Sequence, residues 1–254
     1  MSPKIIFIVP YRNRENDKTH FEVYIKYLLE DIDSNDYEIY YSHQNDTRAF
    51  NRGAVKNIGF IAMRDKYPDR YKSITFVFND IDTLPIRKNM INYLTTHGTV
   101  KHYYGFNFAL GGIFSITGLD FEKINGFPNF WGWGFEDNVI NNRCIENNIN
   151  IDRSNFYNIF DNNFVQTSIT TKKILNNRKP DTNNCSNDNL STIKHLNYNI
   201  DKNIININNF DTIEPYTNSK FYTEDLAYNK GKIDSNKEKS MERLARKARL
   251  AMRF

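Results

Sequence analysis

Two aspartates separated by one residue follow a hydrophobic run. Asp80 and Asp82 come directly after residues 73–78 and Asn79, and this apolar stretch predicts a buried strand. Carboxylates at positions i and i+2 of a strand end can share a divalent cation and the sugar phosphate that it holds. An Asp-x-Asp pair also occurs by chance in solvated loops, so the pair alone leaves both interpretations open.

Three arginines provide the opposite charge. Arg12 and Arg14 lie just after the apolar residues 5–10, and Arg52 lies in the segment Phe50-Asn-Arg-Gly53. The forked guanidinium group matches the oxygens of phosphate. These arginines indicate a diphosphate site more than a structural role.

The segment Trp131-Gly-Trp-Gly-Phe-Glu-Asp137 contains both tryptophans of the chain. Its glycines allow the backbone to approach a ligand closely, and amphipathic rings are suitable surfaces for sugars. An aspartate next to such a surface could take a proton from an acceptor hydroxyl. Alternatively, the rings fill the core, and Glu136 and Asp137 favour a helix N-terminus. Both interpretations can hold together.

The elements that must position these residues alternate in type. Strands are predicted over residues 5–10, 37–41 and 73–78, and helices over residues 21–29, capped by Thr19, and 54–64. This order predicts an α/β sheet with helices on both faces. In such sheets ligands bind at the carboxyl ends of the strands, where Arg12, Arg14, Asp80 and Asp82 should gather.

The remaining chain is patterned less strongly. Helices are expected from about Asp120 and over residues 138–146, with weak strand patterning over residues 196–210 and a polar, Asn-rich loop over residues 176–189. We predict a catalytic domain over residues 1–215 and an extension over residues 216–254, whose end from Asn236 reads as a basic amphipathic helix.

Taken in order, these motifs resemble the β-1,4-galactosyltransferase family. The resemblance covers residues 4–155 and rests on the segments 10–14, 50–52, 78–82, 111–112, 125–128 and 131–137. It implies a GT-A fold, which is a Rossmann-like nucleotide-sugar-binding mixed sheet flanked by helices. It also implies inverting transfer of a hexose or N-acetylhexosamine from a UDP-sugar to a glycan or another hydroxyl acceptor.

The resemblance also assigns roles. The uridine diphosphate would be held by Pro10, Tyr11, Arg12, Arg14, Phe50 and Arg52. Asp80 would contact nucleotide or metal, and Asp82 would bind Mn²⁺. The donor would contact Ala109, Gly111 and Gly112, and the donor or acceptor sugar would contact Trp133, Gly134 and Glu136. The catalytic residues would be Asp137, as the base, and Glu136.

The sequence departs from the family at the metal site. The family completes this site with histidines downstream of the Trp-Gly motif, but counting from Trp131 places Asn163 and Gln166 there. Neutral amide oxygens would bind the cation more weakly. Asp161 is a candidate substitute, and His195 would need a different loop path, so the requirement for metal is open.

A second departure concerns the donor. Galactosyl-transferring relatives carry Tyr where this chain has Ala109, and a small side chain leaves room for a 2-acetamido group. UDP-GalNAc and UDP-GlcNAc therefore join UDP-Gal as candidate donors. A shift of one residue would place Leu110 there, with the same steric conclusion.

Composition limits the other function classes. The 254 residues carry 34 Lys and Arg against 30 Asp and Glu. The formal charge is +4, but residues 236–254 contribute +5 and the rest about −1, which argues against nucleic-acid binding. Two cysteines exclude a disulfide scaffold. With no signal peptide and no long apolar run, we expect a cytoplasmic protein without anchor or stem, from an AT-rich virus or protist.

Two alternatives follow from these departures. The missing histidines allow a degenerate module that binds glycan or nucleotide without turnover, although the acidic residues are retained. The basic tail allows a helix that lies on anionic membrane, although packing on its own domain or solvation is the simpler interpretation.

Overall fold

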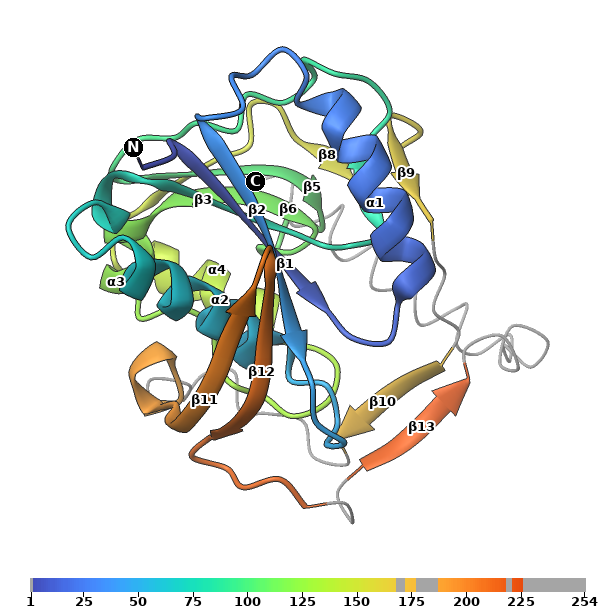
Figure 1. Ribbon diagram of the computed structural model, residues 1–254, viewed down its shortest axis with the longest axis vertical. Coiled ribbons are helices and arrows are strands. Elements are labelled where there is room, and N and C mark those ends of the chain that lie inside the picture. Colours follow the sequence, from blue (N-terminus) through green and yellow to red (C-terminus); the bar gives the residue numbers. More distant parts are fainter. Residues whose placement is uncertain (1, 168–171, 177–186, 218–220, 226–254) are drawn as a thin grey trace, which may run out of the picture.

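A nine-stranded mixed sheet forms the centre of the computed structural model, which describes residues 2–167, 172–176, 187–217 and 221–225 (Figure 1). The strand order is β11-β12-β2-β1-β3-β6-β5-β7, and β8 pairs with β5. Its strands are β1 (Ile5–Tyr11), β2 (Tyr37–Gln44), β3 (Thr75–Asn79), β5 (Thr99–Gly105), β6 (Ile113–Thr117), β7 (Asn150–Asp152), β8 (Tyr157–Asn158), β11 (Lys194–Asp201) and β12 (Ile204–Asp211).

Helices cover both faces of this sheet. The helix α1 (Glu15–Leu28) packs on one face, and α2 (Arg52–Lys66), α3 (Gly118–Lys123) and α4 (Glu136–Glu146) lie on the other (Figure 1). The β1 side chains alternate between the two cores, with Ile6 and Ile8 facing α2 and Phe7 facing α1. The continuous apolar run of β1 is explained by this double coverage. The predicted α/β fold with helices on both faces is confirmed.

Parallel pairing sets the functional edge. β1 lies between β2 and β3 and is parallel to both, while β6 pairs antiparallel with β3 and β5. The carboxyl ends of the three parallel strands therefore meet at one edge of the sheet. The first residues of α2 reach the same edge, and the cap of α2 is Asn51, whose Oδ1 accepts the N–H of Ala54 at 2.9 Å.

Several local predictions need correction. Thr19 does not cap α1: the helix begins at Glu15, and the Thr19 hydroxyl donates to Glu15 O inside its first turns. The α4 helix begins at Glu136, two residues earlier than predicted. By contrast, the weak strand pattern over residues 196–210 is confirmed. These residues lie in a hairpin of β11 and β12, and β12 extends the sheet next to β2.

Two short ribbons stand outside the main sheet. β4 (Thr83–Pro85) pairs with β9 (Phe164–Gln166), and β10 (Lys172–Asn176) pairs with β13 (Phe221–Asp225) (Figure 1). Within the described residues, the 3₁₀ turns η1 (Tyr71–Ser73) and η3 (Leu190–Thr192) connect other elements. The basic tail lies outside the described residues, as does most of the Asn-rich segment, so the proposed boundary between residues 215 and 216 stays a prediction.

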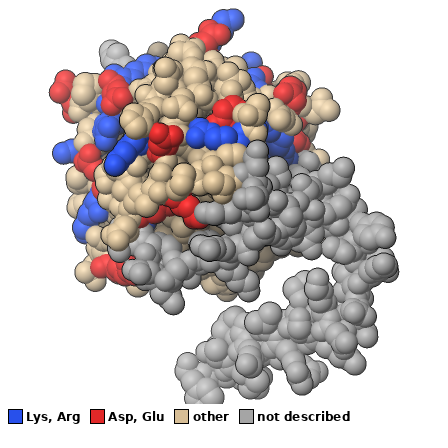
Figure 2. Space-filling model, turned by 90° about the horizontal axis from the view of Figure 1, so that it is seen from below, with Lys and Arg blue, Asp and Glu red and all other residues tan. Residues whose placement is uncertain are grey.

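The surface of the described part mixes both signs of charge. Figure 2 shows Lys and Arg side chains interleaved with Asp and Glu on one face, beside a broad uncharged area. Among the described residues, no helix combines the length and apolar character that crossing a bilayer requires.

Candidate active site

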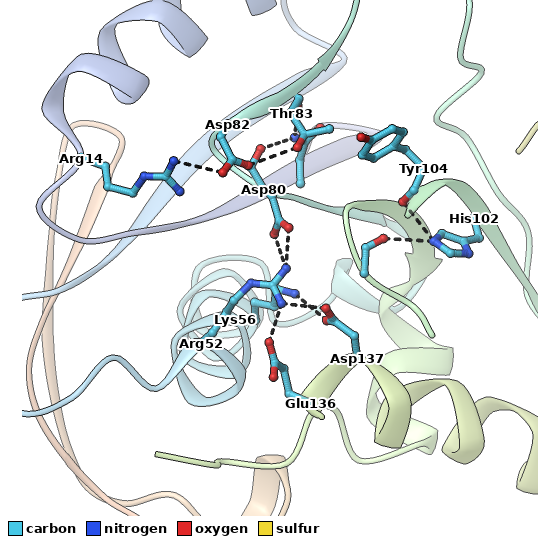
Figure 3. Close-up of polar contacts among 12 residues, drawn as sticks. Arg14, Arg52, Lys56, Asp80, Asp82, Thr83, His102, Tyr104, Glu136 and Asp137 are labelled. Atoms are coloured by element: carbon cyan, nitrogen blue, oxygen red, sulfur yellow. Dashed lines mark hydrogen bonds and ion pairs between the residues drawn. The ribbon is translucent and has the colours of Figure 1, made fainter. Parts of the chain in front are cut away.

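The end of β3, the N-terminus of α2 and the N-terminus of α4 meet at the carboxyl edge of the sheet. They bring together Asp80, Arg52, Glu136 and Asp137 (Figure 3). The turn between β5 and β6 that contains Gly111 and Gly112, called here the glycine turn, is attached to this cluster by two backbone hydrogen bonds. Asp80 N–H donates to Gly112 O at 3.0 Å, and Leu110 N–H donates to Asp137 O at 2.8 Å.

Arg52 is the centre of this cluster. Its Nη2 pairs with both carboxylate oxygens of Asp80, at 2.6 Å from Oδ2, while its Nη1 donates to Glu136 and, at 2.7 Å, to Asp137 Oδ2. Burial alone would lower the pKa of Arg52, but the three carboxylates raise it well above its ordinary value. The guanidinium is therefore permanently charged and holds three separate chain segments together.

Asp137 is paired at both oxygens. Oδ2 accepts from Arg52, and Oδ1 lies 3.2 Å from Nζ of Lys56. Burial would raise the pKa of Asp137, but the cations of Arg52 and Lys56 outweigh it and lower that pKa. Asp137 is thus ionised at neutral pH, which is the state that a proton acceptor needs.

Asp82 lies next to this cluster. It accepts from Arg14 at 3.0 Å and from the Thr83 hydroxyl at 3.1 Å. Burial raises the pKa of Asp82, and the neighbouring carboxylate of Asp80 raises it further. Repulsion between two hard oxygen donors is the condition that a divalent cation relieves. Magnesium-like ions are commonly held by one or two carboxylates plus substrate phosphates, so these two residues fit such an ion.

The two amide candidates for metal binding, Gln166 and Asn163, have different surroundings. Gln166 pairs with Thr83 across the β4–β9 ribbon, and Thr167 N–H donates to Asp82 O at 3.0 Å, so this segment lies beside the acidic motif. The Asn163 amide donates instead to Asp161 Oδ1 at 2.9 Å. No cluster of three or more His, Cys, Asp or Glu side chains that could hold a metal occurs within the described residues.

His195 lies elsewhere in the molecule. It is on the edge strand β11, which β12, β2 and β1 separate from β3, and its Nδ1 is 2.7 Å from Asp211 Oδ2. This position does not support His195 as a ligand of a cation held by Asp80 and Asp82. The reason is that the segment after η3 forms a sheet strand and does not fold back to β3.

The candidate nucleotide residues divide into two groups. Arg14 reaches the acidic cluster, whereas Arg12 donates to the backbone carbonyls of Asp46, at 2.8 Å, and Arg48. Arg12 therefore supports the loop that leads into α2. Pro10 and Tyr11 end β1, and the Tyr11 ring lies 4.9 Å from the His43 ring, centroid to centroid.

The two tryptophans have different environments. Trp131 is 4% exposed, stacks on Phe210 at 5.2 Å, and donates its indole N–H to Thr212 and to the Glu214 carbonyl. Trp133 is 56% exposed. The Phe50 carbonyl accepts the N–H of Gly132, between the two rings, at 3.2 Å. Trp131 thus fills the core, and the interpretation as a sugar surface applies to Trp133.

The glycine turn lies against the candidate base. A Cβ built on Gly111 would lie 2.5 Å from Oδ2 of Asp137, and one on Gly112, whose φ is +69°, would meet Tyr104 O at 2.3 Å. Ala109 is buried, at 5% exposure, and Leu110 is fully buried within the main hydrophobic cluster. Both candidates for the donor position are thus buried, and of the two only Leu110 belongs to the main hydrophobic cluster.

Two residues near the site were not predicted. Lys56 follows Arg52 by one helical turn, and this i,i+4 spacing was the signal that could have identified it. His102 is buried, with Nε2 close to Tyr104 O and to Gly111 O at 3.0 Å (Figure 3). Burial and then Arg153 lower its pKa to about 4, so it is neutral and secures the glycine turn.

Comparison with known proteins agrees with this geometry. Residues 1–95 match the N-terminal region of glycosyl transferase group 7, and residues 95–164 match a family described as the N-terminal domain of galactosyltransferase. The chain belongs to the galactosyltransferase family.

Two relatives from animals show the extent of the sequence similarity. β-1,4-Galactosyltransferase 1 of Homo sapiens is 32% identical over 164 residues, which cover 60% of this chain and 39% of the relative. Xylosylprotein 4-β-galactosyltransferase of Caenorhabditis elegans is 30% identical over 159 residues, which cover 59% and 53%. The chain thus spans about half or less of these relatives.

Solved galactosyltransferase structures share the fold. The catalytic domain of Drosophila β-1,4-galactosyltransferase 7, in complex with xylobiose, has a TM-score of 0.61 at 21% identity, covering 81% of this chain and 94% of that chain. Its D211N mutant, in complex with manganese, UDP-Gal and xylobiose, has a TM-score of 0.63 at 20% identity, with the same coverage. This likeness confirms the expected GT-A fold.

Proposed function

We propose that this protein is an inverting glycosyltransferase that moves a hexose or N-acetylhexosamine from a UDP-sugar to a hydroxyl acceptor. The observation that carries the proposal is the convergence of Asp80, Glu136 and Asp137 on Arg52 in a member of the galactosyltransferase family. The Drosophila structure with UDP-Gal supports the donor class.

In the proposed reaction, Asp137 is the base. Its carboxylate takes the proton of the acceptor hydroxyl, and the hydroxyl oxygen forms a bond to the anomeric carbon of the donor. The bond from that carbon to UDP breaks, and its electrons go to the diphosphate. A single displacement inverts the anomeric carbon, so an α-linked donor gives a β-linked product.

Positive charge near the diphosphate is the second requirement. Arg14 and Arg52 are the guanidinium groups placed beside the acidic motif, and both can pair with phosphate oxygens. Asp80 and Asp82 would hold a divalent cation, Mn²⁺ in the Drosophila complex, which supplies charge neutralisation of the departing diphosphate. The absence of histidine from this position predicts weak metal binding, with Gln166 the nearest of the amide candidates.

The donor sugar is proposed to carry a 2-acetamido group. The small side chain at Ala109, beside the glycine turn, supports UDP-GalNAc or UDP-GlcNAc over UDP-Gal. Leu110 is part of the main hydrophobic cluster and Ala109 is not, so we propose that Ala109 is the residue that faces the sugar.

Exposed aromatic rings support an acceptor with an apolar face, such as a glycan. Phe106 and Phe108 stack at 5.2 Å in the loop before the glycine turn, and Phe108 is 61% exposed. Phe160, which is 73% exposed, follows Ile159, whose N–H donates to Gly105 O. The cytoplasmic location and the viral or protist origin stay predictions.

The test is UDP release from UDP-Gal, UDP-GalNAc, UDP-GlcNAc and UDP-Glc, with Mn²⁺ and with a chelator. Slow hydrolysis to water replaces the unidentified acceptor. We expect metal-dependent release from a 2-acetamido donor, and a loss of about 100-fold or more in Asp137→Asn with UDP binding retained. No release from any donor, despite UDP binding, would favour the degenerate binding module.

A further inference from the structure

Lys56 is a buried cation for which the proposed mechanism has no use. It lies in the second turn of α2 and is 1% exposed, among side chains of the hydrophobic core. Its ammonium lies 4.5 Å from the ring centroid of Phe127 and 3.2 Å from Oδ1 of Asp137. An unpaired ammonium at this depth would be strongly disfavoured. Its presence therefore requires a permanent anion.

Asp137 is that anion. Within the described part of the chain, it is the one carboxylate in ion-pair distance of Lys56. Arg52, in contrast to Lys56, pairs with three carboxylates, those of Asp80, Glu136 and Asp137. When a diphosphate binds near Arg52, these contacts must be redistributed, but Lys56 lies one helical turn deeper and keeps its single partner.

We propose that Lys56 is a positioning residue for Asp137, an inference that rests on the function proposed above. Its ammonium pairs with Oδ1, and Arg52 pairs with Oδ2. Oδ2, which lies against Gly111 at the glycine turn, is therefore the oxygen that receives the acceptor proton once Arg52 turns toward phosphate. Lys56 also keeps the carboxylate charged during donor binding, when Arg52 turns toward phosphate. It does not touch the reacting atoms.

Removing the charge of Lys56 should change the pKa of Asp137 in a defined direction. The charged groups facing Asp137 are Arg52 and Lys56 from α2 and His102 from β5, with Glu136 and Asp80 acting through Arg52. His102, with its pKa of about 4, is neutral above pH 5. Removal of the Lys56 charge removes one of the two cations that lower the pKa of Asp137, so that pKa rises.

The first experiment compares Lys56→Met with Lys66→Met. Lys66 is on the same helix but pairs with Glu38, at 3.1 Å, away from the site. We expect the acidic limb of the kcat/KM profile for UDP release to move up by about one pH unit in Lys56→Met, with about a tenfold loss of rate below that limb. Lys66→Met should leave the limb in place. An unmoved limb in Lys56→Met would overturn the proposal.

A second experiment does not depend on activity. Unfolding midpoints in urea are compared for wild type, Asp137→Asn, Lys56→Met and the double variant. If the pair is specific, Asp137→Asn leaves the buried Lys56 ammonium without its anion and lowers the urea midpoint. Adding Lys56→Met should then raise the midpoint part of the way back to the wild-type value. Additive losses would overturn the proposal, as would failure of both Lys56→Met and the double variant to fold. Absence of UDP release from wild type would instead contradict the proposed function. The urea midpoints would still test the pairing of Lys56 with Asp137.

Discussion

At the scale of single residues, charge balance governs the site. Two cations, Arg52 and Lys56, face three carboxylates, so the cluster carries one excess negative charge before any substrate binds. Such a cluster is stable only while the guanidinium is present. It is also ready to accept a divalent cation at the Asp80 and Asp82 end.

Replacing Arg52 with Met should therefore cost about 3–5 kcal/mol of the free energy of unfolding at pH 7, because buried carboxylates lose their partner. The pKa of Asp137 is lowered in the folded protein, so its ionised form contributes stability above its ordinary pKa of about 3.9. That contribution is lost as the pH falls through the folded value. The difference between wild type and variant should then narrow below about pH 4.

Urea unfolding at pH 7 and pH 3.5 measures both effects. The matched control is Arg64→Met on the same helix, whose contact with Asp65 is at the surface at 3.6 Å. We expect a change of about 0.5 kcal/mol or less in this control. Equal losses in the two variants, or a difference that does not depend on pH, would contradict the central role of Arg52.

The tryptophans provide a second comparison at this scale. Trp131→Ala removes a buried, stacked ring and should cost about 3–5 kcal/mol of stability. Trp133→Ala removes an exposed ring and should change stability by only about 0.5 kcal/mol, while raising the KM for the UDP-sugar. Urea unfolding and UDP-release kinetics on the two variants test the assignment. An unchanged KM in Trp133→Ala would remove the interpretation of this ring as a surface for the donor sugar.

At the scale of elements, the turn between β5 and β6 determines where the base lies. Gly111→Ala would place a methyl group 2.5 Å from Asp137 Oδ2, and the end of the Asp137 side chain would have to move. We expect a protein that folds but loses about 100-fold or more in UDP release, because a misplacement of about 1 Å has effects of this size.

Gly98→Ala is the control for the glycine turn. Gly98 has a φ of +81° and no atom within 4 Å of an added Cβ, so the variant carries backbone strain without a clash at the base. Its cost should be about 1 kcal/mol of stability with full activity. Full activity in Gly111→Ala would show that Asp137 does not need its present position.

At the scale of the whole molecule, ligands should couple to folding. Mn²⁺ and UDP bind the native cluster and not the unfolded chain, so together they should stabilise the protein, by about 2.7 kcal/mol at a hundredfold excess over Kd. Differential scanning fluorimetry measures the shift in Tm. In Asp82→Asn, or with a chelator in wild type, the shift should fall to the one given by UDP alone. The same shift in all three samples would show that Asp82 holds no metal.

The sequence by itself determined the class of fold and the composition of the site. Apolar runs buried on both faces can form only interior strands, and the order of strands and helices then defines an α/β sheet. The motif around Asp80 and Asp82, the arginines and the Trp-Gly segment were all identified from residue type and spacing. Local errors, such as Thr19 as a cap, arose because α1 begins at Glu15 without a side-chain cap, so the capping preference does not mark its start.

Only the tertiary structure decided which charges meet. It placed Arg52 between three carboxylates, turned Arg12 toward a backbone loop, placed His195 on an edge strand and buried Lys56 against Asp137. Residues 52, 80 and 137 are far apart along the chain, so no local pattern encodes their contact. Their pairing depends on strand order and helix packing, and the resulting electrostatics depend on burial, which a sequence pattern does not measure.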